Sequence, residues 1–170
     1  MARFRPIRYD GSAVPTLYAA ESVDAAFSET VFHEIAPEQA SDRFVPSALY
    51  TDRVRVELES ARLLRLCELR GAGLHAIGAP AAVARCGPDE YLSLTVPWAQ
   101  AIYEGSDVDG LIWTSRLDDP RWAIMLFGDR VVERDLSVTV PAIPLDREAG
   151  LDDLTNAATA RRIVLGLSTP

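Results

Sequence analysis

The sequence lacks most of the motifs that mark common enzyme chemistries. Its 170 residues include two cysteines, Cys67 and Cys86, which are too few for a disulfide framework and too far apart for a metal-ligand pair. With two histidines and no Gly-x-Ser-x-Gly motif, a serine hydrolase has no support. Gly-x-Gly-x-x-Gly and Walker motifs are absent, and no cluster has zinc spacing, so we expect no metal.

Long apolar runs are missing as well. No stretch of about 18 apolar residues and no signal-peptide pattern is present, so we expect neither a membrane span nor export, and a reducing cytoplasm suits the cysteine usage. The 25 acidic and 17 basic residues give a formal net charge of −8, which argues against nucleic acid as a direct partner. The length of 170 residues predicts one domain, residues 1–170, and an apolar content of 48% is enough for a sizeable core.

The first eight residues depart from this acidic average. They contain Arg3, Arg5 and Arg8 and no acidic residue. Such a cluster serves either an anionic ligand, such as a phosphate, or no ligand at all, as an ordinary solvated terminus. Composition leaves both interpretations open, although the second is the commoner outcome for a run of charge.

Hydrophobic periodicity predicts an α+β fold with a mixed, mostly antiparallel sheet joined by hairpins more than by crossover helices. Strands are expected at 14–18, 53–59, 63–69, 110–113, 122–127 and 131–141. Helices are expected at 22–35, after Thr95 and at 151–167, with a weak helical turn at 79–85 and irregular chain at 36–50. A turn is expected at Asp10-Gly11-Ser12.

Local patterns refine these elements. Pro15 indicates an edge position or a strand start. The strict alternation of aliphatic and charged residues over 53–59 predicts a half-buried strand. Gly71 and Gly73 are expected to end the strand at 63–69.

The helix after Thr95 has its own start signal. Thr95 is the expected N-cap, with Pro97 in the first turn, where proline is tolerated. Its apolar face is expected to consist of Trp98, Ala101 and Ile102.

The stretch from Leu17 to His33 offers the first candidate site residue. Ser22 is a plausible N-cap, with Asp24 in the first helical turn. The apolar-type residues that recur at helical spacing predict a buried stripe of Val23, Ala26, Phe27, Thr30 and Val31. Glu29 lies at the edge of this stripe. It is a solvated acid, an i,i+4 partner of His33, or a carboxylate held in a cleft for chemistry.

A second candidate follows the strand at 110–113. This apolar run delivers Thr114-Ser115-Arg116 to its end, where functional residues often lie. The alternative is a plain turn before Asp118-Asp119-Pro120.

Several stretches, in this order, resemble the motifs of the RES domain family. They are Arg3-Phe4-Arg5-Pro6, Leu17-Tyr18-Ala19-Ala20-Glu21-Ser22, Ala26-Phe27-Ser28-Glu29-Thr30-Val31-Phe32-His33 and Gly110-Leu111-Ile112-Trp113-Thr114-Ser115-Arg116. The segments Trp98-Ala99-Gln100-Ala101-Ile102 and Leu126-Phe127-Gly128 are also similar. The resemblance runs from Arg3 to about Val140, and the order of the motifs makes it more specific than any one of them.

The resemblance implies an NAD-degrading toxin with a fold like that of the ADP-ribosyltransferase toxins. Such enzymes cleave the nicotinamide–ribose bond by phosphorolysis, with inorganic phosphate as co-substrate, or by hydrolysis, and a helix-turn-helix (Xre-like) antitoxin protein neutralises them. By motif, the implied catalytic residues are Arg3, Glu29 and Ser115, and Arg3, Tyr18 and Ser115 are the implied substrate-binding residues. The alternatives are a mono-ADP-ribosyltransferase acting on protein and a non-catalytic nucleotide- or partner-binding module. The oligomeric state is open.

Each implied role suits its residue type. Glu29 would stabilise the oxocarbenium-like ribose as its charge develops, and Tyr18 would stack on the nicotinamide or ribose. Arg3 would offer its planar fork to a phosphate, and Ser115 would hold the nicotinamide amide or a ribose hydroxyl. We expect Tyr18, Glu29 and Ser115 to line one pocket with Arg3 at its rim. Family members usually carry a strand and a loop before the arginine motif, which here begins at residue 3. If Arg3 needs that segment to hold it in place, Arg5 and Arg8 are the arginines that could substitute for it.

Overall fold

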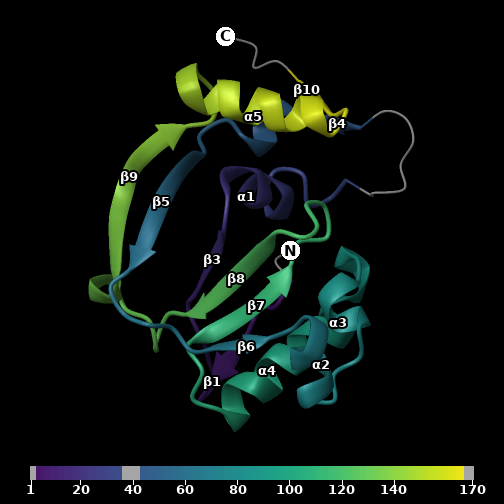
Figure 1. The fold of residues 1–170 in the computed structure, drawn as a ribbon, viewed down its shortest axis with the longest axis vertical. Coiled ribbons are helices and arrows are strands. Elements are labelled where there is room, and N and C mark those ends of the chain that lie inside the picture. Colours follow the sequence, from purple (N-terminus) through teal and green to yellow (C-terminus); the bar gives the residue numbers. More distant parts are fainter. Residues whose placement is uncertain (1–2, 36–42, 167–170) are drawn as a thin grey trace.

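A four-stranded sheet organises the fold in the computed structural model, which describes residues 3–35 and 43–166 (Figure 1). The strands, in their order across the sheet, are β3 (Thr16–Ala20), β8 (Trp122–Phe127), β7 (Gly110–Thr114) and β6 (Leu66–Glu68). β8 is antiparallel to both of its neighbours, whereas β6 runs parallel to β7. The apolar runs of β7 and β8 therefore occupy the two central positions, as their sequences predict.

Three two-stranded sheets complete the strand pairing of residues 3–35 and 43–166. Their strands are β1 (Arg8–Tyr9) with β2 (Ser12–Ala13), β5 (Val54–Ser60) with β9 (Leu136–Pro144), and β4 (Phe44–Val45) with β10 (Val164–Leu165). The first two pairs are antiparallel and the third is parallel. The predicted α+β fold with mostly antiparallel sheets is confirmed.

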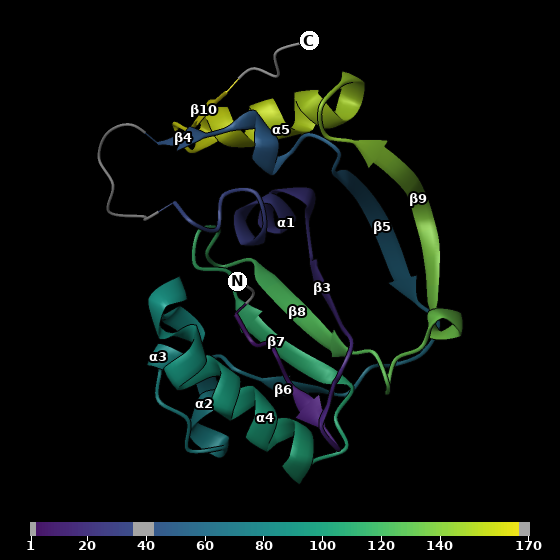
Figure 2. The same ribbon diagram turned by 180° about the vertical axis from the view of Figure 1, so that it is seen from behind.

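The described residues form five α-helices, most of which lie at the two ends of this arrangement. They are α1 (Val23–Glu29), α2 (Gly71–Ala76), α3 (Ala82–Arg85), α4 (Val96–Gly105) and α5 (Glu148–Ala160). Figures 1 and 2 show α2, α3 and α4 gathered beside the sheet, whereas α5 lies at the opposite end with β4 and β10. α1 lies between α5 and the sheet. No helix in the described residues is long and apolar enough to cross a membrane.

Two hydrophobic cores follow from this division. One core lies between the sheet and α2–α4, and Phe4, Trp113 and Phe127 are fully buried in it. The other packs α1 against α5 and includes Phe27, Phe32 and Leu154. Each core buries the apolar face of its helices against a different partner, and α1 stands where the two meet.

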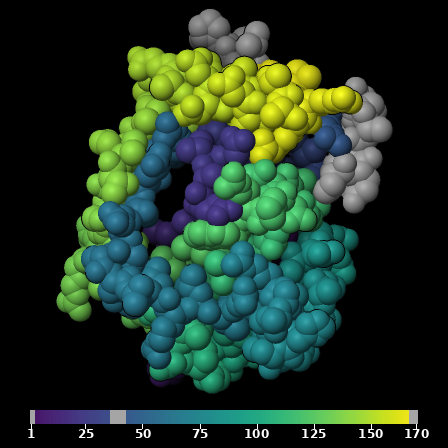
Figure 3. All heavy atoms as spheres, in the orientation of Figure 1, coloured from purple at the N-terminus to yellow at the C-terminus, as the bar shows by residue number. Residues whose placement is uncertain are grey.

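The β5–β9 pair stands away from both cores. Figure 3 shows an opening between β5 and the rest of the molecule. The aliphatic side chains Val54, Val56 and Leu58 are 55%, 44% and 36% exposed. Alternation over 53–59 correctly predicts a strand, but the expected half-buried face is wrong because, in the part of the chain that the structure describes, no second layer covers these side chains.

The first and the last helix, α1 and α5, are both shorter than the hydrophobic periodicity of the sequence predicts. α1 ends at Glu29 rather than at residue 35, because Phe32 N–H donates to the Phe27 carbonyl at 2.9 Å and the chain turns back over the helix. The predicted buried stripe is partly wrong: Ala25, Phe27 and Ser28 are the buried residues of the helix, and Thr30 is exposed. α5 begins before residue 151 and ends at Ala160, and the segment expected to continue it forms strand β10.

Gly71 and Gly73 do not simply end a strand. They begin helix α2, with Gly71 in the left-handed region at φ +47°. A Cβ on Gly73 would collide with the Glu68 backbone, so this close approach of helix and strand needs glycine. The expected helical turn at 79–85 forms in part, as α3.

The remaining differences concern element ends and burial. β6 covers 66–68 rather than 63–69, and β9 begins at Leu136 rather than at 131 because a 3₁₀ turn, Glu133–Asp135, precedes it. β3 starts after Pro15, at an edge of the sheet, as proline favours. The predicted turn at Asp10-Gly11-Ser12 forms between β1 and β2. Residues 36–42 of the expected irregular segment lie outside the described residues, and the expectation is wrong for part of the rest, which forms β4 and a 3₁₀ turn, Ser47–Leu49.

In α4 the predicted apolar face is shifted. Ala99 and Tyr103 are the buried residues, Trp98 and Ile102 are partly buried, and Ala101 is exposed. The helix does begin after Thr95, but Thr95 makes no side-chain cap. Its hydroxyl has a different partner, which belongs to the candidate site.

Candidate active site

Strand β7 carries Ser115 to the end of the sheet. Ser115 follows the last residue of the strand, and its N–H donates to the Arg121 carbonyl at 2.7 Å, which closes the loop between β7 and β8. Trp113 and Ser115 lie two residues apart, so their side chains leave the same face of the strand. The serine is 1% exposed and its hydroxyl has no hydrogen-bond partner in the described part of the chain. A buried hydroxyl left unpaired costs about 1–3 kcal/mol, so this group is open to a ligand.

Glu29 meets the same face of the sheet from α1. It is the last residue of the helix and is half-buried. The indole Nε1–H of Trp113 donates to Glu29 Oε2 at 3.3 Å. Because Trp113 is fully buried, this hydrogen bond fixes the direction of the carboxylate. The expected partner of Glu29, His33, lies instead beside Glu34, with Nε2 3.6 Å from Oε1.

Tyr18 reaches Trp113 from the edge strand β3. The two rings meet edge to face with centroids 6.1 Å apart. The Tyr18 hydroxyl accepts a hydrogen bond from Phe4 N–H at 3.2 Å. Burial raises the pKa of Tyr18 to about 12, although the Phe4 hydrogen bond and the charges of Arg5 and Arg3 act in the opposite direction. The phenol therefore keeps its proton at neutral pH and can donate it to a ligand, but it cannot serve as a general base.

Arg3 is buried, so the expectation that it lies at the rim of a pocket is wrong. It is 4% exposed, and Nη1 donates to the Ala84 carbonyl at 3.0 Å. Its guanidinium carbon lies 5.1 Å from the centroid of the Tyr91 ring. By contrast, Arg5 and Arg8 are exposed. The N-terminal basic cluster thus consists of one anchored arginine and two solvated ones.

A π-helical turn, Tyr91–Thr95, holds this arginine in place. The Thr95 hydroxyl is fully buried and donates to the Arg3 carbonyl, with the Tyr91 carbonyl as a second acceptor 3.1 Å away. Farther along, the Gln100 side chain bonds both the N–H and the carbonyl of Arg8, at 2.9 and 2.7 Å. The segment from Arg3 to Arg8 is therefore fastened to α4 and the turn before it.

Charges from three other segments act on the pKa of Tyr91. Burial raises the pKa of Tyr91; the charges of Arg3 and Arg116 oppose this rise, and that of Glu29 adds to it. Arg116 is itself fixed by a bond from Nη2 to the His33 carbonyl at 2.8 Å. The acid, the two arginines and the buried aromatic rings thus form one group at this end of the sheet.

A cavity of about 530 Å³ opens beside this group. Ser115 and Arg116 line it together with Arg70, His75, Ala84 and Arg85. Of the residues expected in one pocket, Ser115 lines this cavity, but Tyr18 and Glu29 are not among its lining residues and contact Trp113 instead. Arg3 contacts the cavity wall through the Ala84 carbonyl. In the described residues, no three His, Cys, Asp or Glu side chains gather closely enough to hold a metal ion.

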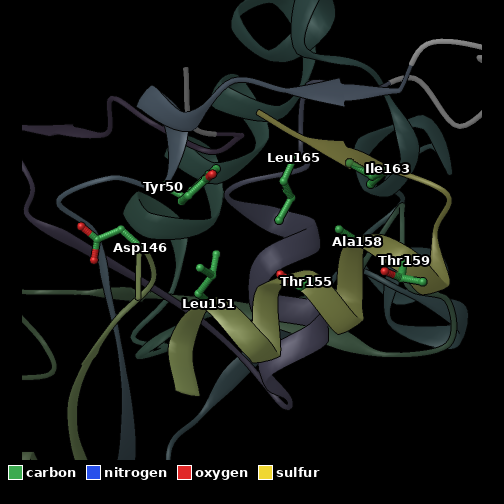
Figure 4. Close-up of a pocket in the computed structure, with 8 residues that line it drawn as sticks. All are labelled: Tyr50, Asp146, Leu151, Thr155, Ala158, Thr159, Ile163 and Leu165. Atoms are coloured by element: carbon green, nitrogen blue, oxygen red, sulfur yellow. The ribbon is translucent and has the colours of Figure 1, made fainter. Parts of the chain in front are cut away.

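A second cavity, of about 450 Å³, lies at the other end of the molecule (Figure 4). Figure 4 shows Leu151, Thr155 and Ala158 of α5 on one side of it and Tyr50 and Leu165 on the other. Its lining is largely apolar and includes none of the residues expected at the site. The cavity beside Ser115 is therefore the candidate active site.

Sequence reasoning missed three members of this group: Tyr91, Thr95 in its actual role, and the contact of Trp113 with Glu29. Trp113 stands in a quoted motif, but its partner is 84 residues away. The π-helical turn has no local signature, since Thr95 before Pro97 looks like an ordinary helix cap. The local signals were the position of Ser115 after an apolar strand and that of Glu29 at the edge of a helical stripe.

The fold and this group define an α+β domain with an acid, aromatic rings and arginines gathered at the end of its central sheet. A family model of the RES domain matches residues 1–148, which include Arg3, Tyr18, Glu29 and Ser115 and nearly all elements before α5. The protein therefore belongs to the RES domain family. No curated protein and no solved structure matches the chain.

Proposed function

We propose that this protein cleaves NAD at the bond between nicotinamide and ribose. Membership of the RES domain family supports this proposal, because the resemblance of the chain to that family implies an NAD-degrading toxin. The observation that carries it is the contact of the half-buried Glu29 carboxylate with Trp113, beside the Tyr18 ring. A directed carboxylate next to aromatic surfaces suits a substrate with a flat cationic leaving group and a ribose that becomes positive.

The residues of the chain divide the reaction among them. As the C1′–N bond breaks, its electron pair passes to the pyridinium ring and nicotinamide leaves as a neutral molecule. The ribose becomes oxocarbenium-like, and the negative charge of Glu29 stabilises it, more strongly in a water-poor cleft than in solution. Water attacks C1′ and loses a proton, giving ADP-ribose, or phosphate attacks, giving the 1-phosphate. The protonated phenol of Tyr18 supplies a hydrogen-bond donor near the ribose.

The test is to incubate the purified chain with NAD, with and without inorganic phosphate, and to measure released nicotinamide by chromatography. Release at a rate above the blank is the expected result. Dependence on phosphate identifies phosphorolysis, and release without phosphate identifies hydrolysis. Label carried from NAD into protein would identify ADP-ribosyl transfer instead. No release under any of these conditions would contradict the proposal and leave a binding module.

We further propose that this activity makes the protein a toxin of the cytoplasm, where it would draw on the NAD pool, and that a helix-turn-helix antitoxin neutralises it. Induction of the intact chain in a bacterial host should stop growth and lower cellular NAD. Induction of Glu29→Gln should do neither. Growth arrest by both forms would separate toxicity from NAD cleavage.

A further inference from the structure

The cavity beside Ser115 gathers positive charge in a protein that is acidic overall. Arg70, Arg85 and Arg116 line it, and Asp119 is the one acidic residue among its lining side chains. The whole chain has the opposite balance, with 25 acidic and 17 basic residues. A concave surface of this sign concentrates and orients an anion.

The three arginines are not equally free to bind one. Arg70 Nε pairs with Glu68 Oε1 at 2.9 Å. Arg116 donates to the His33 carbonyl and, within residues 3–35 and 43–166, has no carboxylate partner. Arg85 is exposed and makes neither a hydrogen bond nor an ion pair in the same part of the chain. Within the described residues, Arg85 and Arg116 thus have guanidinium groups that form no ion pair with a carboxylate.

Ser115 adds a directed hydrogen bond to this charge. Its hydroxyl is buried, lines the cavity and has no partner in the described residues. It lies next to Arg116 in the chain, at the end of a rigid central strand. A hydroxyl and two arginine forks around one space match the tetrahedral oxygens of a phosphoryl group.

The size of the cavity indicates what carries that group. About 530 Å³ lies within the usual range for ligand sites, whereas a water molecule occupies about 30 Å³ and a free phosphate only a few times that. Small side chains form part of the wall, among them Gly71, Ala79, Ala81 and Ala84, and leave the space open. The cavity therefore has room for an organic body attached to the phosphoryl group.

We propose that this cavity is a subsite for a phosphoryl group borne on an organic ligand, with Arg85 and Arg116 binding its oxygens and Ser115 donating a hydrogen bond. The identity of the ligand rests on the proposed function, under which the group is the diphosphate of NAD. Inorganic phosphate is the other source of the same chemistry. Arg3, which was expected to bind phosphate, is held behind the Ala84 carbonyl and is a positioning residue in this arrangement.

A binding experiment tests the subsite without relying on turnover. AMP, inorganic phosphate, adenosine and acetate are titrated calorimetrically into the full chain and into Arg85→Gln, Arg116→Gln and Arg134→Gln. Arg134 is exposed and outside the cavity, so its variant is the matched control. AMP should bind the parent chain and the control alike, and about tenfold to a hundredfold more weakly to the other two variants. Because Arg85 is exposed, its variant should fold normally, and Arg85→Lys should restore part of the affinity.

Kinetics then identify the source of the group. If it is the diphosphate, Arg85→Gln raises the KM for NAD and leaves that for nicotinamide riboside unchanged. If it is free phosphate, the same variant loses the acceleration by phosphate and keeps its KM for NAD. The subsite would be overturned if neither AMP nor phosphate binds the Arg85 and Arg116 variants more weakly than it binds the parent chain and the control. Binding of acetate as tight as that of AMP would also overturn it. A chain that binds AMP in this way but releases no nicotinamide would refute the proposed function and keep the subsite.

Discussion

At the scale of single residues, one neighbour sets the orientation of the Glu29 carboxylate. Trp113 Nε1 is its hydrogen-bond donor, and the indole has no freedom to move because it is fully buried. A glutamine at this position keeps an oxygen that can accept the same hydrogen bond, and it loses only the negative charge. The substitution therefore separates the electrostatic contribution from the geometric one.

We predict that Glu29→Gln folds as the parent chain does and loses about 10²–10³ in the rate of NAD cleavage, as removal of one preorganised stabiliser typically does. Nicotinamide release and thermal unfolding measure the two effects. Glu34→Gln is the control, since Glu34 is exposed and its neighbour is His33. Parental turnover in Glu29→Gln would mean that Glu29 is an ordinary acid at the end of a helix.

Arg3, unlike Glu29, contributes mainly to the stability of the fold. Its hydrogen bond to Ala84 and its position over Tyr91 are buried contacts within the protein. We predict that Arg3→Ala lowers the free energy of unfolding by about 2–3 kcal/mol, from the lost hydrogen bond and cation–π contact, and that Arg3→Lys recovers part of it. Denaturant unfolding measures both. Arg5→Ala, at an exposed neighbour, should change stability by less than about 0.5 kcal/mol. Equal stability of the Arg3 and Arg5 variants would mean that Arg3 is not anchored in solution.

At the scale of elements, the π-helical turn before α4 connects the arginine to the helices. Such turns often occur at functional sites, because the extra residue redirects a side chain. Here it places Tyr91 against the Arg3 guanidinium and the Thr95 hydroxyl against the Arg3 carbonyl. One short turn thus holds both the side chain and the backbone of the same residue.

We predict that Thr95→Val, which keeps the shape and removes the hydroxyl, destabilises the fold by about 1–3 kcal/mol because the Arg3 carbonyl loses its buried donor. It should also slow NAD cleavage, since Arg3 supports the wall beside Ser115. Thr95→Ser keeps the hydroxyl and should restore most of both properties. The measurements are unfolding by denaturant and nicotinamide release. If the serine variant is no better than the valine variant, packing of the methyl group, not the hydrogen bond, explains the effect.

Helices and strands were predictable from the sequence where neighbouring residues alone decide the structure. The apolar runs of β7 and β8 identify the central strands, and Ser22 caps α1 as expected, accepting from Ala25 N–H at 3.1 Å. The ends of helices and strands were not predictable, because contacts with residues distant in the sequence decide them. β10 forms where a helix was expected, since Val164 pairs with Phe44, more than a hundred residues earlier in the chain. Alternation in β5 reports the period of a strand and says nothing about whether another layer covers it.

The candidate site shows the same limit. The end of an apolar strand is visible in the sequence, and it locates Ser115. The burial of Arg3 is not visible in the sequence, because a run of arginines at a terminus resembles solvated charge. The partners of Arg3, Ala84 and Tyr91, are also remote from it in sequence. Only the order of several weak motifs linked these residues to one family before their positions were known.

At the scale of the whole molecule, the β5–β9 ribbon is attached to the sheet through a buried acid. Asp109, just before β7, is 5% exposed and accepts from Arg62 Nη1 and Nη2 at 2.9 and 2.8 Å and from Arg65 N–H at 2.7 Å. Arg62 follows β5, and its Nε lies 3.6 Å from Asp135 Oδ2, just before β9. The two strands of the ribbon, which no core covers, are thus fixed at their base by one cluster of charge.

The hydrogen bonds from Arg62 hold the pKa of Asp109 below its ordinary value, with a further contribution from Arg65 N–H and against the effect of burial. A carboxyl group whose pKa is lower in the folded state stabilises the fold above its unfolded pKa, which is about 3.9, and loses that contribution as the pH falls below it. We predict that Asp109→Asn lowers the free energy of unfolding at pH 7 by about 1–3 kcal/mol, a range limited by the partial exposure of Arg62. The difference from the parent chain should shrink as the pH falls from about 5 to about 2.

Denaturant unfolding over this pH range measures that difference, and Asp107→Asn is the matched control. Asp107 also pairs with an arginine, Arg65, at 2.7 Å, but both side chains are largely exposed, so its loss should change stability little at any pH. Amide hydrogen exchange gives a second readout: in Asp109→Asn, protection should fall in β5 and β9 more than in β7 and β8. The ribbon loses its attachment to the sheet and keeps the one from Arg55 to Asp153 of α5, while the sheet keeps its core. A pH-independent difference between Asp109→Asn and the parent chain would mean that the asparagine acts by disturbing the packing near β7, and that the charge of Asp109 does not secure the ribbon.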